Sequence, residues 1–315
     1  MRVALQGNPC GIALFDSALK AAHEAAGAQD YPKSALYVVA TPIGNLADIS
    51  LRALHVLSLA DHIACEDTRH TRTLLRAYGI DKSSAQLLAL HQHNETQAAH
   101  TVVDLLRQGA RVVCVSDAGT PGISDPGARL VAHVRAQGLR VLPLPGASSV
   151  TALLSAAGAV QGGEGDAGFV FAGFLPSKTG ERVQALDALA SQSRAFVLLE
   201  APHRMQALAQ ALSSLGERTL TVGRELSKQF EEIASMRADA LGDWLGADSM
   251  RLRGEFTLVV HAPHAPIEQP QDDRILRLLL AELPLKTAVK LAADISGEAR
   301  NALYERALAL KQQDA

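Results

Sequence analysis

Short apolar runs alternate with longer amphipathic stretches in the first half of the chain. Between the apolar runs, residues 96–107 and 128–137 repeat apolar side chains at helical spacing. Apolar strands separated by helices are typical of a mostly parallel sheet covered on both faces. We therefore predict an α/β domain over residues 34–161. Its strand-like runs are residues 36–40, 62–65, 111–115 and 140–142.

A second set of alternating runs follows a glycine-rich interruption at residues 162–168, which suits a loop between domains. Helical patterns at 182–189 and 205–215 separate only the first three strand-like runs, so we expect a mixed sheet. This pattern predicts a second α/β domain over residues 168–263. Its strand-like runs are residues 169–174, 195–199, 219–223, 232–236 and 256–261.

The two ends of the chain differ from these domains. Residues 1–33 show little periodicity beyond a possible short helix at 18–26, and we expect a loosely ordered extension. A polar linker at 264–273 precedes a helical segment over residues 274–312, broken at Leu283-Pro284 and near Gly297. This segment carries more Lys and Arg than Asp and Glu, which fits either a solvated helical face or an RNA contact.

Composition narrows the class of protein. A chain of 315 residues with 48% apolar and only 4% aromatic residues suits two α/β cores. A net charge of −3 argues against broad DNA binding, so any nucleic-acid contact must be local. No apolar run reaches membrane-spanning length, no secretory signal opens the chain, and three cysteines without a CxxC pair indicate no disulfide framework. We expect a cytoplasmic protein without membrane or DNA partners.

Three loops that follow strands are rich in Gly, Pro and small polar residues: residues 40–45, 116–127 and 144–149. In open α/β sheets, ligands bind beyond the carboxyl ends of the strands. The first loop is neither a dinucleotide-binding fingerprint nor a phosphate-binding P-loop, which counts against both functions. The second loop is too long and constrained for a simple connector, so we expect these loops to form a ligand site.

Individual residues in the loops have different expected roles. Asp117 follows an apolar strand and could accept hydrogen bonds from ligand hydroxyls or amines. Asp125 precedes Pro126, which suits the N-cap of a helix, so we assign it a mainly structural role. Gly146 allows the backbone to approach a ligand, and Ser148 either caps the next helix or leaves N–H groups for a ligand acceptor.

Polar residues also cluster at two other places, residues 66–72 directly after a strand and residues 91–95. Asp67 or Thr68 could cap a helix on which Arg69 and Arg72 would either bind phosphate or simply face solvent. The run at 91–95 offers two His and a carboxylate but lacks a clear fourth ligand, so we predict no metal site.

Seven segments, in this order and spacing, resemble the ribosomal RNA methyltransferase branch of the tetrapyrrole methylase superfamily. The similarity covers residues 36–261 and extends to KTAVK at 286–290 and NALY at 301–304. The segments are VATPIGNLADIS, CEDTRHTRTLL, HNE, VSDAGTPGISDPG, LPGASS, LLEAPHR and GRELSKQFEE.

The resemblance implies two α/β domains of the tetrapyrrole methylase type, with the methyl donor S-adenosylmethionine in the cleft between them, plus the helical C-terminal piece. It also implies a homodimer that methylates the ribose 2′-oxygen of a cytidine in 16S ribosomal RNA, within the small ribosomal subunit. The superfamily's first glycine loop is replaced here by Thr-Pro-Ile-Gly-Asn at 41–45, a departure that disfavours tetrapyrrole substrates.

The resemblance also suggests site residues. A ribose hydroxyl is a poor nucleophile, so a base is expected nearby; the candidates, which we leave unranked, are Glu66, Asp67, His93 and Glu95. The expected RNA contacts are Arg69, Arg72, Asn94, Arg204, Lys286 and Lys290. The expected cofactor-binding residues are Thr41, Asp117, Ala118, Gly119, Thr120, Gly146, Ala147 and Ser148.

Two other functions stay open at this point. A small-molecule methyltransferase of the corrin or diphthine type would act without RNA, and the 41–45 loop speaks against it. A non-catalytic RNA-binding or assembly factor would bind no cofactor, and the loops around Asp117 and Gly146 speak against it.

Overall fold

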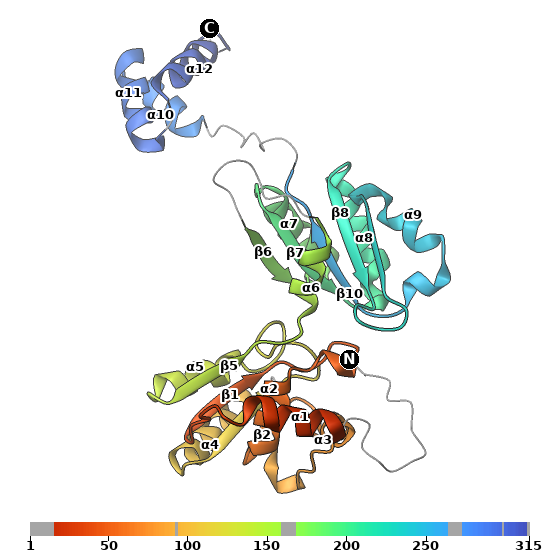
Figure 1. The fold of residues 1–315 in the computed structure, drawn as a ribbon. Coiled ribbons are helices and arrows are strands. Elements are labelled where there is room, and N and C mark those ends of the chain that lie inside the picture. Colours follow the sequence, from red (N-terminus) through yellow and green to blue (C-terminus); the bar gives the residue numbers. More distant parts are fainter. Residues whose placement is uncertain (1–15, 92–93, 159–167, 264–272, 298, 314–315) are drawn as a thin grey trace. The chain divides into compact units, whose positions relative to one another are not determined.

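The computed structural model describes residues 16–91, 94–158, 168–263, 273–297 and 299–313 (Figure 1). The chain divides into two compact units, Met1–His264 and Ala265–Ala315, and each is treated by itself. The first unit contains two five-stranded sheets, and the second contains three helices.

The first sheet is entirely parallel, with strand order β3-β2-β4-β1-β5. This confirms the predicted mostly parallel sheet; only the short β3 escaped prediction, because three residues with one buried side chain give no periodic signal. The strands are β1 (Ala35–Val39), β2 (His62–Cys65), β3 (Leu87–Ala89), β4 (Arg111–Val115) and β5 (Arg140–Leu144). The connecting helices are α2 (Leu51–Leu59), α3 (Thr68–Ala77), α4 (Glu95–Arg107) and α5 (Ala128–Ala136).

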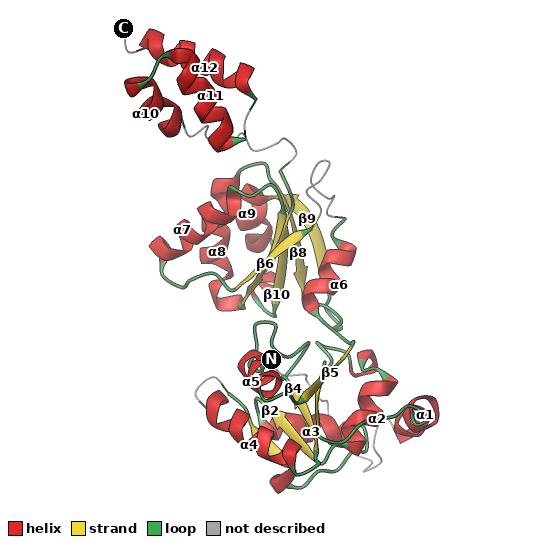
Figure 2. Ribbon diagram, turned by 90° about the vertical axis from the view of Figure 1, so that its left-hand side faces the viewer, coloured by secondary structure: helices red, strands yellow, loops and turns green. Residues whose placement is uncertain are grey.

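Helices cover both faces of this sheet because successive strand side chains point to opposite sides (Figure 2). On β4, Val113 and Val115 join one apolar cluster with α2 and α3, whereas Val112 and Cys114 join another with α4 and α5. Cys65 lies in the first cluster, and burial raises the thiol pKa of Cys65 to about 11 and of Cys114 to about 12. Both are free, buried cysteines, as the sequence suggested.

The second sheet is mixed, as predicted, with strand order β6-β7-β10-β8-β9. Only β6 and β7 run parallel; β10 pairs antiparallel with both β7 and β8, and β8 pairs antiparallel with β9. Helices α7 (Thr179–Ala190), α8 (Met205–Leu212) and α9 (Leu241–Gly246) pack on one face. The strands are β6 (Phe169–Gly173), β7 (Ala195–Glu200), β8 (Thr219–Arg224), β9 (Glu232–Arg237) and β10 (Phe256–Val260).

Helix α6 (Ser149–Ala156) covers the other face of the second sheet. Its Val150 and Leu153 form an apolar cluster with Val197 of β7 and Val259 of β10. The contact is tight, since a Cβ on Gly223 would lie 2.7 Å from a Leu153 methyl carbon. Our predicted division, which placed residues up to 161 with the first domain, therefore assigns α6 to the wrong sheet.

Helix α1 (Asp16–Ala26) packs against α2 instead of forming part of a loose extension. Ala22 is fully buried, and the ring of His23 lies 5.5 Å from that of His55 on α2. The expected loose extension is thus wrong for residues 16–33, because small alanines allow α1 to approach α2 closely. Residues 1–15 lie outside the described part of the chain.

The second unit consists of α10 (Arg274–Glu282), α11 (Leu285–Ser296) and α12 (Arg300–Gln313) around a small apolar core. The predicted breaks are confirmed: Pro284 precedes α11, and Gly297 ends it with a φ of 75°. Within the described ranges, no helix combines the length and apolar character that crossing a bilayer requires.

Two neighbouring alanines test the packing of α1. Ala22→Leu should lower the free energy of unfolding by about 1–3 kcal/mol, because the added carbons overfill a closed contact. Ala21→Leu, on the exposed side of the same helix, should change it by less than about 0.5 kcal/mol. Urea unfolding of both variants measures the difference; equal effects would mean that α1 is not packed in solution.

Candidate active site

The loops after β1 and β4 meet at the carboxyl edge of the parallel sheet, where backbone hydrogen bonds join them. The N–H of Thr41 donates to the Gly119 carbonyl at 3.0 Å, and the N–H of Gly119 donates to the Thr41 carbonyl at 2.9 Å. The buried Thr41 hydroxyl also donates to the Ser116 carbonyl at 3.1 Å. Gly119 has a φ of 82°, a left-handed conformation that glycine adopts without strain.

The loop after β5 packs against both of these loops. The Thr120 hydroxyl donates to the Ala147 carbonyl at 3.1 Å. A Cβ on Gly146 would lie 2.7 Å from the Ala40 Cβ, so glycine is needed for the loops to approach each other. We predicted that Gly146 allows the backbone to approach a ligand; in the structure it allows the close approach of the β1 loop.

The second sheet contributes the β8–β9 loop, which lies against the β1 loop. A Cβ on Gly44 would lie 2.3 Å from the Lys228 side chain, and the Ser227 hydroxyl donates to Asp48. The Lys228 ammonium donates to Glu225 at 2.7 Å and to Glu255 at 3.2 Å. Burial lowers the pKa of Lys228, but these two carboxylates outweigh burial and leave the pKa raised, so the lysine stays charged.

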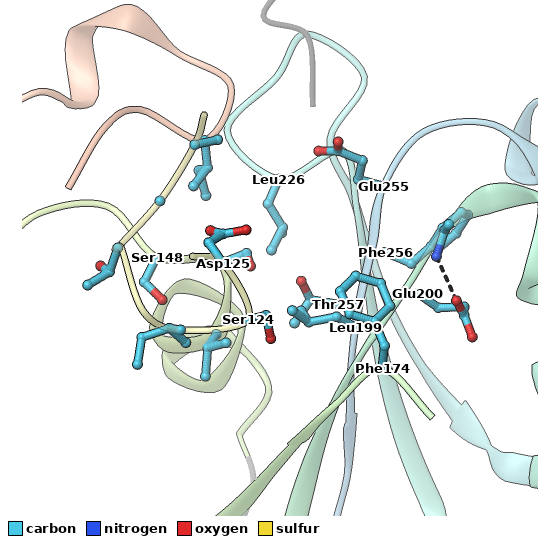
Figure 3. Close-up of a pocket in the computed structure, with 18 of the residues that line it drawn as sticks. Ser124, Asp125, Ser148, Phe174, Leu199, Glu200, Leu226, Glu255, Phe256 and Thr257 are labelled. Carbon is cyan, nitrogen blue, oxygen red and sulfur yellow. Dashed lines mark hydrogen bonds between the residues drawn. The ribbon is translucent and has the colours of Figure 1, made fainter. Parts of the chain in front are cut away.

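Between the two sheets lies a cavity of about 310 Å³ (Figure 3). The loops after β4 and β5 form one wall, which Figure 3 shows with Ser124, Asp125 and Ser148. Phe174 and Thr257 belong to the facing wall from the second sheet. The cavity volume lies at the lower end of the range for small-molecule pockets, roughly 300–1,000 Å³.

Four of the eight predicted cofactor residues line this cavity: Ala118, Gly119, Thr120 and Ser148. The other four, Thr41, Asp117, Gly146 and Ala147, are not among its lining residues. Asp117 accepts a hydrogen bond at 3.2 Å from the N–H of Asp67, which links the β4 and β2 loops.

The lining fits S-adenosylmethionine in chemical character. Ile43, Leu199 and Leu226 provide apolar surface for a base, and hydroxyls and carboxylates on both walls offer partners for ribose and amine groups. The sequence analysis placed the methyl donor between the two domains but named no cofactor-binding residue from the second sheet, because its apolar cavity residues, such as Leu199 and Leu226, look like ordinary core residues.

Two of the four candidate bases have structural partners. Asp67 is the N-cap of α3 and accepts from the N–H groups of Arg69 at 2.8 Å and His70 at 3.4 Å, which lowers its pKa. Glu95 is buried and accepts from the N–H groups of Gly127 at 3.0 Å and Arg129 at 3.1 Å. It therefore stabilises the start of α5.

The other two candidate bases are His93 and Glu66. His93 lies outside the described residues. The pKa of Glu66 is raised by burial and then by the nearby charges of Asp117 and Asp67, but Glu66 is not among the residues that line the cavity.

Asp125 is the acid that the sequence misassigned. The N-cap of α5 is Gly127, and Glu95 binds the free N–H groups there, so Asp125 is not the cap. Asp125 lines the cavity, and burial, followed by the charges of Glu66 and Asp117, raises its pKa to about 7. The Asp-Pro pair was a misleading signal because the helix begins two residues later than it suggests.

The residues predicted to contact RNA lie in different local environments. Arg69 is largely exposed beside Asp67, and Arg72 donates to Ser84 at 2.9 Å. Asn94 closes its own loop through the His91 N–H at 2.8 Å and the Ala89 carbonyl at 2.9 Å.

Arg204 differs from these because its side chain contacts other parts of the protein. It pairs with the buried Glu200 at 3.1 Å and donates to the Leu175 carbonyl. Lys286 and Lys290 are exposed one turn apart on α11. In the described part of the chain, no group of three or more His, Cys, Asp or Glu residues could hold a metal ion.

Comparisons with known proteins agree with this architecture. Residues 35–242 match the family Tetrapyrrole (Corrin/Porphyrin) Methylases, and residues 267–311 match the RsmI C-terminal HTH domain. The chain is 45% identical to the ribosomal RNA small subunit methyltransferase I of Escherichia coli O157:H7, covering 89% of this chain and 96% of the relative. The enzyme of that name from Pseudomonas aeruginosa is also 45% identical, covering 87% and 96%.

The chain belongs to the ribosomal RNA small subunit methyltransferase I family. This places it among the tetrapyrrole methylases, as the sequence resemblance indicated. A cobalamin biosynthetic enzyme, cobalt precorrin-4 methyltransferase, shares the fold with a TM-score of 0.51 and 19% identity over 72% of this chain and 94% of its own. This chain thus combines the two-sheet methylase fold with an added helical unit, which lies in the segment that matches the RsmI C-terminal HTH domain.

Two substitutions of Asp67 separate capping from catalysis. Asp67→Ala should lower the free energy of unfolding at pH 7 by about 0.5–2 kcal/mol, whereas Asp67→Asn keeps the cap and should change it little. Because the folded-state pKa of Asp67 is lowered, the part of its stabilisation that depends on the negative charge is present above the unfolded pKa, about 3.9, and is lost as the pH falls through the folded pKa; Asp67→Asn lacks this part at every pH.

Denaturant unfolding between pH 3 and pH 7 measures these differences, and a methyl-transfer assay accompanies it. A stable Asp67→Asn variant with wild-type activity supports the capping role. Loss of activity in that stable variant would restore Asp67 as a catalytic base.

Proposed function

We propose that this enzyme methylates the ribose 2′-oxygen of a cytidine in 16S ribosomal RNA, using S-adenosylmethionine. The observation that carries the proposal is the 45% identity, over nearly the full length of both chains, to methyltransferases named for small-subunit ribosomal RNA. The cavity between the sheets, lined by four of the predicted cofactor residues, supplies a place for the methyl donor.

The methyl donor, when bound, supplies a carbon attached to a sulfonium. The chain's own task is to hold the acceptor oxygen in line with that carbon, and such positioning contributes on the order of 7–11 kcal/mol. The joined loops around Thr41, Gly119 and Ala147 make the first wall of the cavity rigid, which favours this alignment. Apolar lining residues such as Leu199 and Leu226 exclude water from the reaction.

The proposal includes a homodimer, a cytoplasmic site of action and RNA contacts from the helical unit. A homodimer follows from the sequence resemblance. Ribosomal RNA as substrate requires the cytoplasm as the site of action. Lys286 and Lys290 on α11, within the segment matched by the family's helical domain, are exposed candidates for phosphate contacts.

The acceptor can be identified directly. Purified enzyme with tritiated S-adenosylmethionine should label small ribosomal subunits that lack this modification, and nucleoside analysis should recover the label as 2′-O-methylcytidine. Label on a small molecule alone, or on a base instead of a ribose, would contradict the proposed acceptor while leaving the fold and cofactor unaffected.

The helical unit can be tested by removing two of its exposed positive charges. Lys286→Gln/Lys290→Gln should weaken binding to small subunits and reduce the slope of log affinity against log salt by about two. Lys20→Gln/Lys33→Gln, which removes two exposed charges from the first unit, is the matched control and should leave the slope unchanged. Fluorescence titrations at several salt concentrations give both slopes; identical slopes for the two variants would exclude the α11 contact.

A further inference from the structure

We propose that Asp125 is the catalytic base that takes the proton from the ribose 2′-hydroxyl, an inference that rests on the proposed methylation of RNA. Asp125 belongs to the cavity wall that the β4 and β5 loops form. In Figure 3 it stands between Ser148, from the β5 loop, and Leu226, from the β8–β9 loop of the second sheet. A group at this position reaches molecules that enter between the sheets.

The backbone on both sides of Asp125 is fixed. Ser124 has a φ of 67°, an uncommon left-handed conformation for a residue with a side chain. Such conformations persist only where surrounding contacts hold them, and they are frequent at active sites. Here Gly173 of β6 approaches Ser124 so closely that an added Cβ would lie 3.2 Å from the Ser124 hydroxyl, and on the other side Glu95 binds the N–H of Gly127 at 3.0 Å.

The other two acids that line the cavity are already neutralised. Glu200 pairs with Arg204 at 3.1 Å and accepts from the Ala201 N–H at 2.9 Å. Glu255 pairs with Lys228 at 3.2 Å. Among the described residues, Asp125 forms no ion pair with a lysine or arginine, so its carboxylate remains available to a substrate hydroxyl.

The charges around Asp125 suit it to exchange a proton near neutral pH. Glu66 from the β2 edge and Asp117 from the β4 edge act on it from its own sheet and raise its pKa, whereas the nearby Ser116 hydroxyl acts in the opposite direction. Lys228 and Glu255, which neutralise each other, belong to the other wall. Burial, reinforced by the two carboxylates, raises the pKa of Asp125 to about 7, and catalytic bases are most effective near the working pH.

The step balances as an in-line displacement. The bond between the ribose oxygen and the methyl carbon forms while the bond between that carbon and sulfur breaks, and sulfur keeps the electron pair. The hydroxyl proton moves to an oxygen of the Asp125 carboxylate and is later released to water.

The test compares Asp125→Asn and Asp125→Glu with Asp104→Asn, which removes an exposed charge from α4. Single-turnover methylation of small subunits should slow by about 10²-fold or more in Asp125→Asn and recover partly in Asp125→Glu. The wild-type rate should rise with pH through about 7, and this rise should be absent in Asp125→Asn. Asp104→Asn should match the wild type throughout.

Two further readouts do not depend on activity. Calorimetry should give similar S-adenosylhomocysteine affinities for wild type and Asp125→Asn. In cofactor-free protein, ¹³C NMR should show one carboxyl that titrates near 7 and is missing from Asp125→Asn.

Three results would overturn the assignment: a fully active Asp125→Asn, an Asp125 carboxyl titrating near 4, or a tenfold affinity loss with an unchanged rate at saturating cofactor. The last would make Asp125 a cofactor ligand. Failure of the wild type to methylate RNA would instead refute the proposed function.

Discussion

The two backbone hydrogen bonds between Thr41 and Gly119 hold the loops on which the cavity depends. β1 and β4 are parallel neighbours, but the chain beyond β4 turns back so that Gly119 meets Thr41 in antiparallel pairing. Only a residue that tolerates a positive φ makes this turn without strain, and Gly119 does so. With the turn fixed, the rest of the β4 loop extends towards the second sheet and brings Asp125 to the cavity.

Apolar contacts join the two sheets around this cavity. Ile43 from the β1 loop and Leu226 from the β8–β9 loop belong to the same buried cluster as Leu153 of α6. The polar groups that hold each wall, such as Glu95 and Lys228, are paired within that wall. The site therefore combines a rigid polar edge from the first sheet with an apolar surface from the second, a combination suited to positioning a methyl donor.

The sequence predicted most of the fold because long apolar strands and helices carry strong periodic signals. It failed where tertiary contacts decide: the periodicity of α6 shows that it is a helix, but not which sheet Leu153 packs against. In the site, the order of motifs picked out three loops that contribute to the lining of one cavity. Individual roles were harder to predict, because Asp67, Glu95 and Asp125 are chemically alike and only their hydrogen bonds and burial separate a cap from a base.

The central position of β10 has a consequence for how the protein is made. β7 and β8 pair only through β10, which leaves the ribosome about 100 residues after α6. At 5–20 residues per second, that delay lasts on the order of 5–20 s. During this interval Val150 and Leu153 of α6 have no complete sheet to cover. Exposed apolar surface of this kind binds chaperones and promotes aggregation. A nascent chain that stalls before residue 256 therefore lacks the strand that joins β7 to β8, and its second sheet stays incomplete.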